Sequence, residues 1–339
     1  MKEKHFKGFL YALGAIAVVL IIIKTDWKEV ADHIRSLSPK TIALLLLAQC
    51  ITKLLLALQW RSMALRVKQN VSFLDMLMMN AKGNVVDAIT PGVKAGGELA
   101  RVYELKKRLR IDFGKAIIII GLQKTLSLLS FIFLTLLSLI WFSFTMSIKY
   151  RHYLYVFSLV LVMFVVFLGI IILFSFKPAL VNKLLRKFLG KTRLMDKIDK
   201  TLIDYSSIIR DFLRDKRKFS FQMFLALFIW IFYAFKLLLV LRGLAIKMDY
   251  ISIGAITFLT YIMGMVPMLP GSVGSFEGSM LILLIIRGIS MEMGLTVAFI
   301  FRFVTFWFEF VISGFILMLD NVFALARDRK GDNNVEVRM

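Results

Sequence analysis

Two short segments far apart in the chain share one pattern of helix-breaking and charged residues. In "PGVKAGGE", residues 91–98, and in "PGSVGSFE", residues 270–277, a Pro-Gly pair is followed at the same distance by a glutamate. Proline ends a helix because it lacks a backbone N–H and clashes with the preceding turn, while glycine permits sharp turns and close backbone approach. A helix that restarts after such a break presents unpaired N–H groups and a positive dipole end, which favour anions. Each segment therefore predicts an anion-binding half-helix with a carboxylate in its first turn.

The predicted binding residues are the glycines of these segments, the two glutamates and the nearest arginines. New helices are expected to begin near Ala95 and Ser275. Carboxylates inside a membrane are costly and usually line a pathway or pair with a basic group, so Arg101 and Arg302 are the expected partners of the glutamates. The alternative is that each glutamate only caps its own helix. The full predicted set is Gly92, Gly96, Gly97, Glu98, Arg101, Gly271, Gly274, Ser275, Glu277 and Arg302.

Catalytic chemistry has little support in the sequence. An enzyme of the common classes needs a nucleophile with a base, or a metal cluster. The three histidines of the chain show no metal-ligand spacing, and the sequence holds neither a Walker loop nor a G-x-G-x-x-G motif. We therefore expect no catalytic residue, no cofactor and no metal site.

Composition places the chain in the membrane. Hydrophobic residues make up 59% of its 339 residues and the mean hydropathy is +0.78, whereas ordinary soluble domains are about 45–50% apolar. The formal net charge is +22, but the lysines and arginines fall mainly between long apolar segments. This placement is typical of topology signals in a membrane protein, so nucleic acid is not an expected partner.

The apolar segments predict the fold class. A membrane-spanning helix needs about 20 apolar residues. An all-α, polytopic integral membrane protein is predicted, with six full spans near residues 9–23, 41–65, 114–142, 153–176, 219–244 and 294–319. The first span lacks a small-residue cleavage site and is interpreted as retained. The interrupted stretches 73–91 and 251–269, and the short stretch 279–289, predict two broken or re-entrant hairpins.

Positive charge predicts the orientation of these hairpins. Segment 101–115 carries six Lys/Arg against two acidic residues, and segment 177–218 carries thirteen against five. Both are expected to be cytoplasmic by the positive-inside tendency. The first hairpin then enters from the cytoplasm and the second from outside. The expected location is the plasma membrane, with multiple spans and both termini in the cytoplasm.

The two halves of the chain align at an offset of 179 residues, which superposes both Pro-Gly pairs, both glutamates and the surrounding apolar stretches. Because the hairpins face opposite sides, this is an inverted repeat, an architecture typical of secondary transporters with midplane binding sites. The predicted organisation is residues 1–40, first span and outer loop; 41–142, repeat 1; 143–218, a span and a basic cytoplasmic connector; 219–321, repeat 2; and 322–339, a cytoplasmic tail.

Further polar residues lie in or beside the predicted spans. Lys53 and Lys236 are interpreted as lysines that extend toward the interface. Arg302 and Glu309 are seven residues apart, which places them on one helix face, and they are candidates for a polar pathway. Within 177–218 apolar positions recur among basic ones, which favours interfacial amphipathic helices on anionic lipid; a solvated connector is the alternative.

The segments "TPGVKAGGELARVYELKK" and "MLPGSVGSFEGSMLILL" resemble the paired signatures of the lysylphosphatidylglycerol synthase transmembrane family. This flippase-like membrane domain occurs in the multiple peptide resistance factor and in stand-alone proteins, and the resemblance covers roughly residues 10–325. It implies movement of an anionic or aminoacylated lipid between leaflets, with lysine transfer in a separate soluble domain that is expected to be absent here. The family often has an acidic-basic pair where this sequence has Gln123 and Lys124.

A lipid flippase that works by alternating access is therefore the predicted function. Its expected partner is a membrane phospholipid or a lipid-linked anion. Two alternatives stay open: a membrane transferase, acting on phosphatidylglycerol or on lipid-linked sugars, and a scaffold that serves a separate lipid-modifying enzyme without moving lipid.

Overall fold

The structure is a computed structural model that describes residues 25–68, 70–90, 95–177, 193–266 and 272–320, with a few single positions between 178 and 192 and residue 322. All regular elements in these ranges are helices. The predicted span at 9–23 lies outside the described residues, as does almost all of the predicted tail at 322–339.

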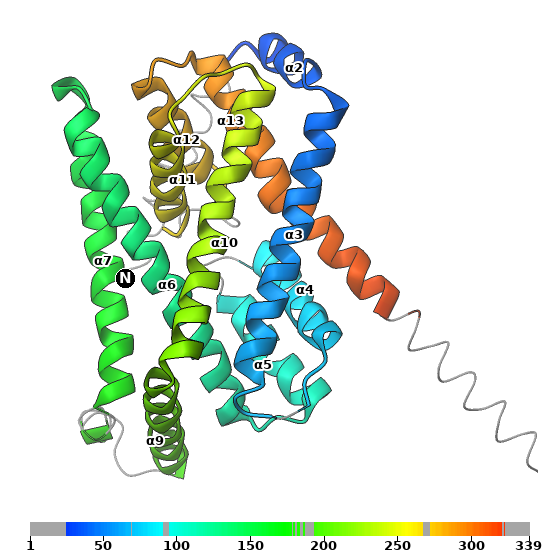
Figure 1. The fold of residues 1–339 in the computed structure, drawn as a ribbon, viewed down its shortest axis with the longest axis vertical. Coiled ribbons are helices and arrows are strands. Elements are labelled where there is room, and N and C mark those ends of the chain that lie inside the picture. The colour runs from blue at the N-terminus through cyan, green and yellow to red at the C-terminus, as the bar shows by residue number, and fades with distance from the viewer. Residues whose placement is uncertain are drawn as a thin grey trace, which may run out of the picture.

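Five long apolar helices form the body of the protein (Figure 1). At 1.5 Å per residue, even the shortest exceeds the roughly 30 Å thickness of a bilayer's hydrocarbon core. Many of their apolar side chains are exposed, as expected for helices that contact lipid. They coincide with five of the six predicted spans and are long and apolar enough to cross a membrane, as expected for a multi-pass membrane protein. These helices are α3 (Pro39–Ala64), α6 (Phe113–Thr145), α7 (His152–Phe176), α10 (Lys216–Gly243) and the helix Met291–Asp320, which begins with α13 (Met291–Arg302) and the π-helix η3 (Phe303–Trp307).

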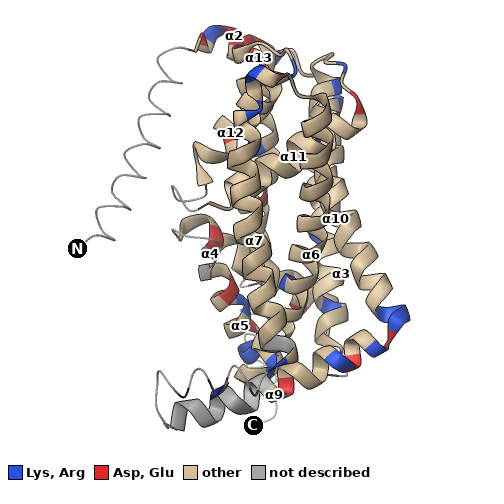
Figure 2. Cartoon of the chain, turned by 90° about the vertical axis from the view of Figure 1, so that its left-hand side faces the viewer, with Lys and Arg blue, Asp and Glu red and all other residues tan. Residues whose placement is uncertain are grey.

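Two pairs of shorter helices occupy opposite halves of the molecule (Figures 1 and 2). The pair α4 (Phe73–Ile89) and α5 (Ala95–Leu109) lies in the half that ends at α9 (Arg193–Arg214). The pair α11 (Tyr250–Gly264) and α12 (Ser275–Ile286) lies in the half that ends at α2 (Trp27–Arg35). Each helix is shorter than the roughly 20 residues of a full span.

Hydrogen bonds at the two ends agree with this arrangement. Lys68 follows α3 and donates to the backbone oxygen of Leu109, the last residue of α5, at 2.6 Å. At the other end Arg287, which follows α12, donates to the hydroxyl of Thr145, the last residue of α6, at 2.9 Å. The open ends of the two helix pairs therefore contact opposite ends of the long helices.

The two pairs break for different local reasons. Helix α4 ends at Ile89, and its cap residue Thr90 is extended, the conformation favoured directly before a proline. Helix α11 instead ends at Gly264, well before Pro270, so this proline does not itself terminate the helix. The chain turns into α12 through left-handed backbone at Ser272 (φ 59°) and Gly274 (φ 84°), and the second of these positions uses glycine's freedom at positive φ.

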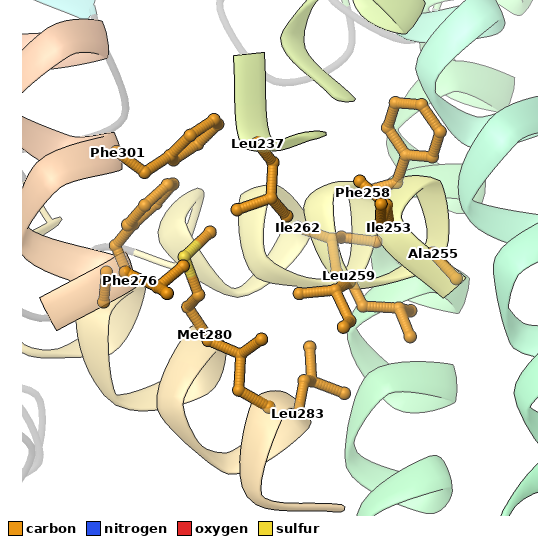
Figure 3. Close-up of a cluster of buried hydrophobic side chains, with 14 of the residues drawn as sticks. Leu237, Ile253, Ala255, Phe258, Leu259, Ile262, Phe276, Met280, Leu283 and Phe301 are labelled. Carbon is orange, nitrogen blue, oxygen red and sulfur yellow. The ribbon is translucent and has the colours of Figure 1, made fainter. Parts of the chain in front are cut away.

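Each helix pair is packed into its own apolar cluster. The larger cluster surrounds α11 and α12; Figure 3 shows Leu259 and Ile262 of α11 beside Met280 of α12 and Phe301 of α13. Phe276 and Phe301 are almost fully buried, with ring centroids 6.1 Å apart and nearly parallel planes. The smaller cluster surrounds α5 and the adjoining parts of α3, α4 and α6. Well-packed clusters of this kind fix the hairpins against the long helices.

Helix α9 uses its apolar face within the protein. Ile209 and Phe212 are buried in the smaller cluster, with Tyr205 packed beside them, while Arg214 is exposed. The amphipathic pattern was interpreted above as a lipid-facing surface. Within residues 203–214 these side chains pack against the protein, whereas Ile203 and Leu213 are exposed and available to lipid; nothing is described of the side chains of 193–202.

Candidate functional site

The first buried charge cluster centres on Arg101 of α5, which is 4% exposed. One guanidinium nitrogen, Nη1, lies 2.9 Å from Glu98 Oε1, and the other, Nη2, lies 3.2 Å from Asp87 Oδ2. Nη2 also donates to Asn84 Oδ1 at 2.7 Å. A planar guanidinium suits several planar acceptors at once, so Arg101 ties the first turn of α5 to the facing side of α4. The α5 site comprises Asp87, Glu98, Arg101 and Lys124.

Glycines allow α4 and α5 to approach closely enough for these bonds. A Cβ atom at Gly97 would lie 2.2 Å from the Asp87 carboxylate, and one at Gly83 would lie 2.4 Å from Nε of Arg101. A Cβ atom at Gly96 would meet the Thr90 hydroxyl at 2.5 Å. Both predicted glycines of α5 therefore lie at close contacts inside the helix pair.

Lys124 joins the α5 site from α6. Its Nζ lies 2.5 Å from Glu98 Oε1, the oxygen that also contacts Arg101. Glu98 thus bridges two cations. The neighbouring Gln123 turns to another partner and donates to Gln59 of α3 at 3.0 Å. Of the two positions where the family often has an acidic-basic pair, Lys124 is therefore part of the α5 site, whereas Gln123 bonds to α3 instead.

The second cluster, the α12 site, comprises Glu277 and Arg302 with the rings around them. Arg302 Nε lies 3.3 Å from Glu277 Oε1, and its guanidinium carbon lies 4.7 Å from the ring centre of Phe276 and 4.2 Å from that of Phe306. Cation–π contacts of this kind favour a charged guanidinium in a desolvated site. The structure therefore brings together both glutamate-arginine pairs expected from the sequence.

The N-termini of both half-helices already receive a carboxylate from the protein. The backbone N–H of Gly97 donates to Asp87 Oδ1 at 2.9 Å, and that of Gly274 donates to Glu277 Oε2 at 2.7 Å. Glu277 therefore both caps its own helix and pairs with an arginine, so the two interpretations above are compatible. At these two amides the expected anion-binding positions hold the chain's own carboxylates.

The remaining predicted residues have simpler positions. Helices α5 and α12 begin at Ala95 and Ser275, as expected. The hydroxyl of Ser275 donates to the backbone oxygen of Ser272 at 3.2 Å, within its own turn. Gly92 and Gly271 lie outside the described residues.

A third charge cluster lies between the long helices and was not predicted as a unit. Lys53 of α3 contacts Glu309 Oε1 at 2.7 Å and Ser313 Oγ at 2.6 Å, and Gln49 donates to Glu309 Oε2 at 2.8 Å. Lys236 of α10 donates to Gln49 Oε1 at 2.6 Å. We call Gln49, Lys53, Lys236 and Glu309 the central cluster.

The central cluster corrects one expectation and joins the α5 site. Lys53 and Lys236 are 2% and 0% exposed. The prediction that they extend to the membrane interface is therefore wrong, and each binds polar partners inside the protein. Asn84 connects the clusters, because its Oδ1 accepts from Arg101 while its Nδ2 donates to Glu309. Asn84 and Asp87 lie in the interrupted stretch 73–91 and were not among the predicted binding residues; their polar character within an apolar stretch was the available signal.

The α9 end of the helix pair has its own ion pairs. Glu104 of α5 is buried and contacts Lys82 at 2.5 Å and Arg108 at 2.9 Å. Arg108 also pairs with Asp320, at the far end of the long helix that carries Glu309. These bonds fasten α5 to that helix. Within the described residues, no group of three or more His, Cys, Asp or Glu side chains is placed to hold a metal ion.

Comparisons with known proteins agree along almost the whole chain. The sequence profile described as the lysylphosphatidylglycerol synthase TM region matches residues 9–313. A UPF0104 membrane protein of Methanothermobacter thermautotrophicus is 22% identical, covering 90% of this chain and 92% of the relative. UPF0104 membrane proteins of Pyrococcus horikoshii and Methanocaldococcus jannaschii are 24% and 23% identical, covering 92% and 94% of this chain and 97% and 96% of their own lengths.

Proposed function

The chain belongs to the lysylphosphatidylglycerol synthase transmembrane family, and we propose that it is a flippase for an anionic or aminoacylated phospholipid or a lipid-linked intermediate. One observation carries the proposal. Two buried arginines, Arg101 and Arg302, each pair with a glutamate in the first turn of a half-length helix, and these two helices lie in opposite halves of the molecule. Buried cations in two such positions suit a phosphate that is handed from one leaflet to the other.

An inverted repeat underlies this arrangement. The elements α3 to α6 follow the order long, short, short, long, and the same order recurs from α10 to the helix Met291–Asp320. The short pairs act as re-entrant hairpins that enter from opposite sides. Inverted repeats with discontinuous helices place substrate sites near the bilayer midplane and support alternating access.

The substrate phosphate exchanges with a carboxylate at each site. Arg101 and Lys124 both contact one oxygen of Glu98, and a headgroup phosphate takes its place on these two cations. At the α12 site a phosphate replaces Glu277 on Arg302. Arginine suits this exchange because its donors match carboxylate and phosphate oxygens equally well.

When no lipid is bound, the arginines pair with the protein's own glutamates, and this pairing allows the cations to stay buried. Leaving a buried charge without its partner costs about 3–5 kcal/mol. The carboxylates remove that penalty when no lipid is bound. A neutral headgroup cannot take over their role, so the arrangement selects lipids with an anionic group.

Orientation follows from charge. The basic segments 101–115 and 177–218 belong to the end of the molecule where α9 lies. By the positive-inside tendency this end faces the cytoplasm of the plasma membrane, together with both chain termini. The α5 site then receives lipid from the inner leaflet and the α12 site from the outer leaflet.

Vesicles of phosphatidylcholine and phosphatidylglycerol, with a fluorescent label on a phosphatidylglycerol acyl chain, test the proposal. The double variant Glu277→Gln/Arg302→Gln removes both charges without leaving either unpaired. The matched control is Arg242→Gln, an exposed arginine at the end of α10. We expect the double variant to lose about tenfold or more in label exchange between leaflets, equivalent to at least 1.4 kcal/mol of lost phosphate binding, while the control retains it.

The same vesicles give the opposing result. If the wild-type protein exchanges label no faster than empty vesicles, the chain is no flippase for this lipid. If the double variant equals the wild type, the α12 site does not hold the phosphate.

A further inference from the structure

The buried ion pairs of the described residues leave one lysine without a carboxylate. At the α5 site, Arg101 and Lys124 balance Asp87 and Glu98, and at the α12 site Arg302 balances Glu277. In the central cluster Lys53 pairs with Glu309. A protonated Lys236 therefore gives the central cluster one positive charge in excess.

The surroundings of Lys236 can hold a proton but have no countercharge in contact. Its Nζ donates to Gln49 Oε1 at 2.6 Å and to Thr52 Oγ1 at 3.1 Å, and lies 3.7 Å from the ring centre of Tyr233. These three partners satisfy the three N–H bonds of an ammonium group. They are all neutral, and a buried ammonium without an anion is strongly disfavoured by desolvation.

A lipid phosphate cannot supply the missing charge by direct contact. Lys236 is 0% exposed and Lys53 is 2% exposed, so a phosphate group has no surface of either side chain to bind. A proton needs no such opening, because it moves through hydrogen-bonded side chains and transient water. The site fits a proton better than any larger ligand.

We infer that the central cluster is a proton-binding site in which the amine of Lys236 gains and loses one proton as lipid moves. This inference rests on the proposed function and adds its coupling ion. In the releasing step one N–H bond of the Lys236 ammonium breaks, the proton passes to water, and the amine keeps the electron pair. The charge of the central cluster then falls from one positive charge to zero.

A chain of hydrogen bonds connects the central cluster to the α5 site. Lys236 contacts Gln49, Gln49 contacts Glu309, and Glu309 accepts from Asn84, which in turn accepts from Arg101. A change of charge at Lys236 therefore acts on the bonds that hold Arg101. An anionic headgroup at the α5 site adds the negative charge that the protonated cluster lacks, so lipid and proton binding reinforce each other.

Other titratable groups around Lys236 are already engaged. The helices packed against α10 carry Lys53 on α3, Tyr261 on α11, Lys124 on α6, and Arg302 and Glu309 on the last long helix, and α10 itself carries Tyr233. Arg302 pairs with Glu277. Lys53 and Glu309 pair with each other, and Lys124 pairs with Glu98. The two tyrosine rings pack together with centroids 5.1 Å apart. Lys236 is the group in this set whose charge has no opposite charge in contact.

Because proton binding and lipid binding reinforce each other, a pH gradient should move lipid in one direction. A proton and an anionic lipid that bind together travel together, so a pH gradient drives the lipid from the acidic to the alkaline side. A gradient of about one pH unit is a tenfold difference in proton activity, and it shifts the steady leaflet ratio of the lipid by up to about tenfold.

The experiment uses the labelled phosphatidylglycerol vesicles with a pH gradient of either direction. Lys236→Met removes the titrating amine, and Lys236→Gln is a second, polar replacement in case the first fails to fold. The matched control is Lys216→Met, an exposed lysine on the same helix. We expect the wild type and the control to follow the gradient, whereas both Lys236 variants move the label without responding to it.

A second measurement does not depend on lipid movement. Potentiometric titration of the purified proteins in detergent is expected to show one proton more per chain for the wild type than for Lys236→Met. Equal proton uptake, or a gradient response that survives in both Lys236 variants, overturns the inference. Variants that lose all lipid movement while their proton uptake matches the wild type would make Lys236 a permanent charge for the lipid, which also overturns it.

The two proposals fail separately. Wild-type protein that shows the extra proton but moves no lipid refutes the flippase and leaves the proton site. Wild-type protein that moves lipid without the extra proton refutes the proton site and leaves the flippase.

Discussion

Gly97 provides a direct test of how closely α4 and α5 must pack. An alanine here places its Cβ atom 2.2 Å from both Cγ and Oδ1 of Asp87, far inside van der Waals contact. The Asp87 carboxylate must move away or the helices must separate, and in either case the bond from the Gly97 N–H to Asp87 Oδ1, now 2.9 Å, is stretched or lost. The substitution changes no charge, so its effect reports packing at the α5 site.

The expected loss of stability follows from three contributions. Overpacking costs about 1–3 kcal/mol, and loss of a hydrogen bond to a charged group costs about 1.5–3 kcal/mol. The higher helix propensity of alanine offsets about 1 kcal/mol of this. Gly97→Ala should therefore destabilise the protein by about 1.5–5 kcal/mol, or lower its unfolding temperature by roughly 3–10 °C at about 2 °C per kcal/mol.

Gly278→Ala in α12 is the matched control. A Cβ atom at Gly278 meets nothing within 4 Å, so this variant should unfold at the same temperature as the wild type or slightly higher. Thermal unfolding in detergent, followed by intrinsic fluorescence, compares the two. Equal unfolding temperatures for both variants would refute the close packing of α5 on Asp87. In an Asp87→Ala background the effect of Gly97→Ala should shrink, because the atoms it collides with are gone.

Three further predictions concern the charges and the topology. Lys53→Met leaves Glu309 without its cation and should destabilise the protein by about 3–5 kcal/mol, whereas adding Glu309→Leu should restore part of the loss; unfolding temperatures of both decide this. Asp249 caps α11; burial alone would raise its pKa, but hydrogen bonds from Ser252 and the charge of Arg287 hold the pKa below its ordinary value of 3.8. The ionised Asp249 carboxylate therefore stabilises the fold above pH 3.8, and this stabilisation is lost as the pH falls through the lowered pKa. Asp249→Ala should lower the free energy of unfolding by about 1 kcal/mol at pH 7 and by progressively less in strong acid. Unfolding measured as a function of pH tests this. In a Cys50→Ser background, cysteines at the exposed positions Lys107 and Lys247 should react with impermeant thiol reagents from opposite sides of the membrane; reaction from one side would end the inverted-repeat proposal.

Local patterns were sufficient to predict the helices and the pairs that lie close in the sequence. Five spans and the first residues of α5 and α12 follow from apolar length and from the Pro-Gly breaks. Glu98 and Arg101 are three residues apart on one helix, a spacing that places side chains on the same face. Their ion pair is therefore visible in the sequence.

Long-range polar contacts were not predictable in the same way. Lys53 and Lys236 lie among apolar neighbours in the sequence, which favoured extension to the interface. Their partners Glu309 and Gln49 are 256 and 187 residues away, and no local pattern signals that distance. Amphipathic α9 has the same difficulty, because its periodicity predicts an apolar face without indicating whether lipid or protein covers it.

The long helix Met291–Asp320 connects the two ends of the proposed pathway. Seven residues separate Arg302 from Glu309, which in a regular α-helix would place both on one face. The π-helix at 303–307 interrupts that register, and the two side chains contact different neighbours: Arg302 meets α12, and Glu309 meets α3 and α4. π-helical turns occur frequently at functional sites. Because this one helix holds the partner of Glu277 and the partner of Lys53, a shift of the helix changes the α12 site and the central cluster together. Such a shared element is what alternating access requires, since a change on one side must be felt at the other.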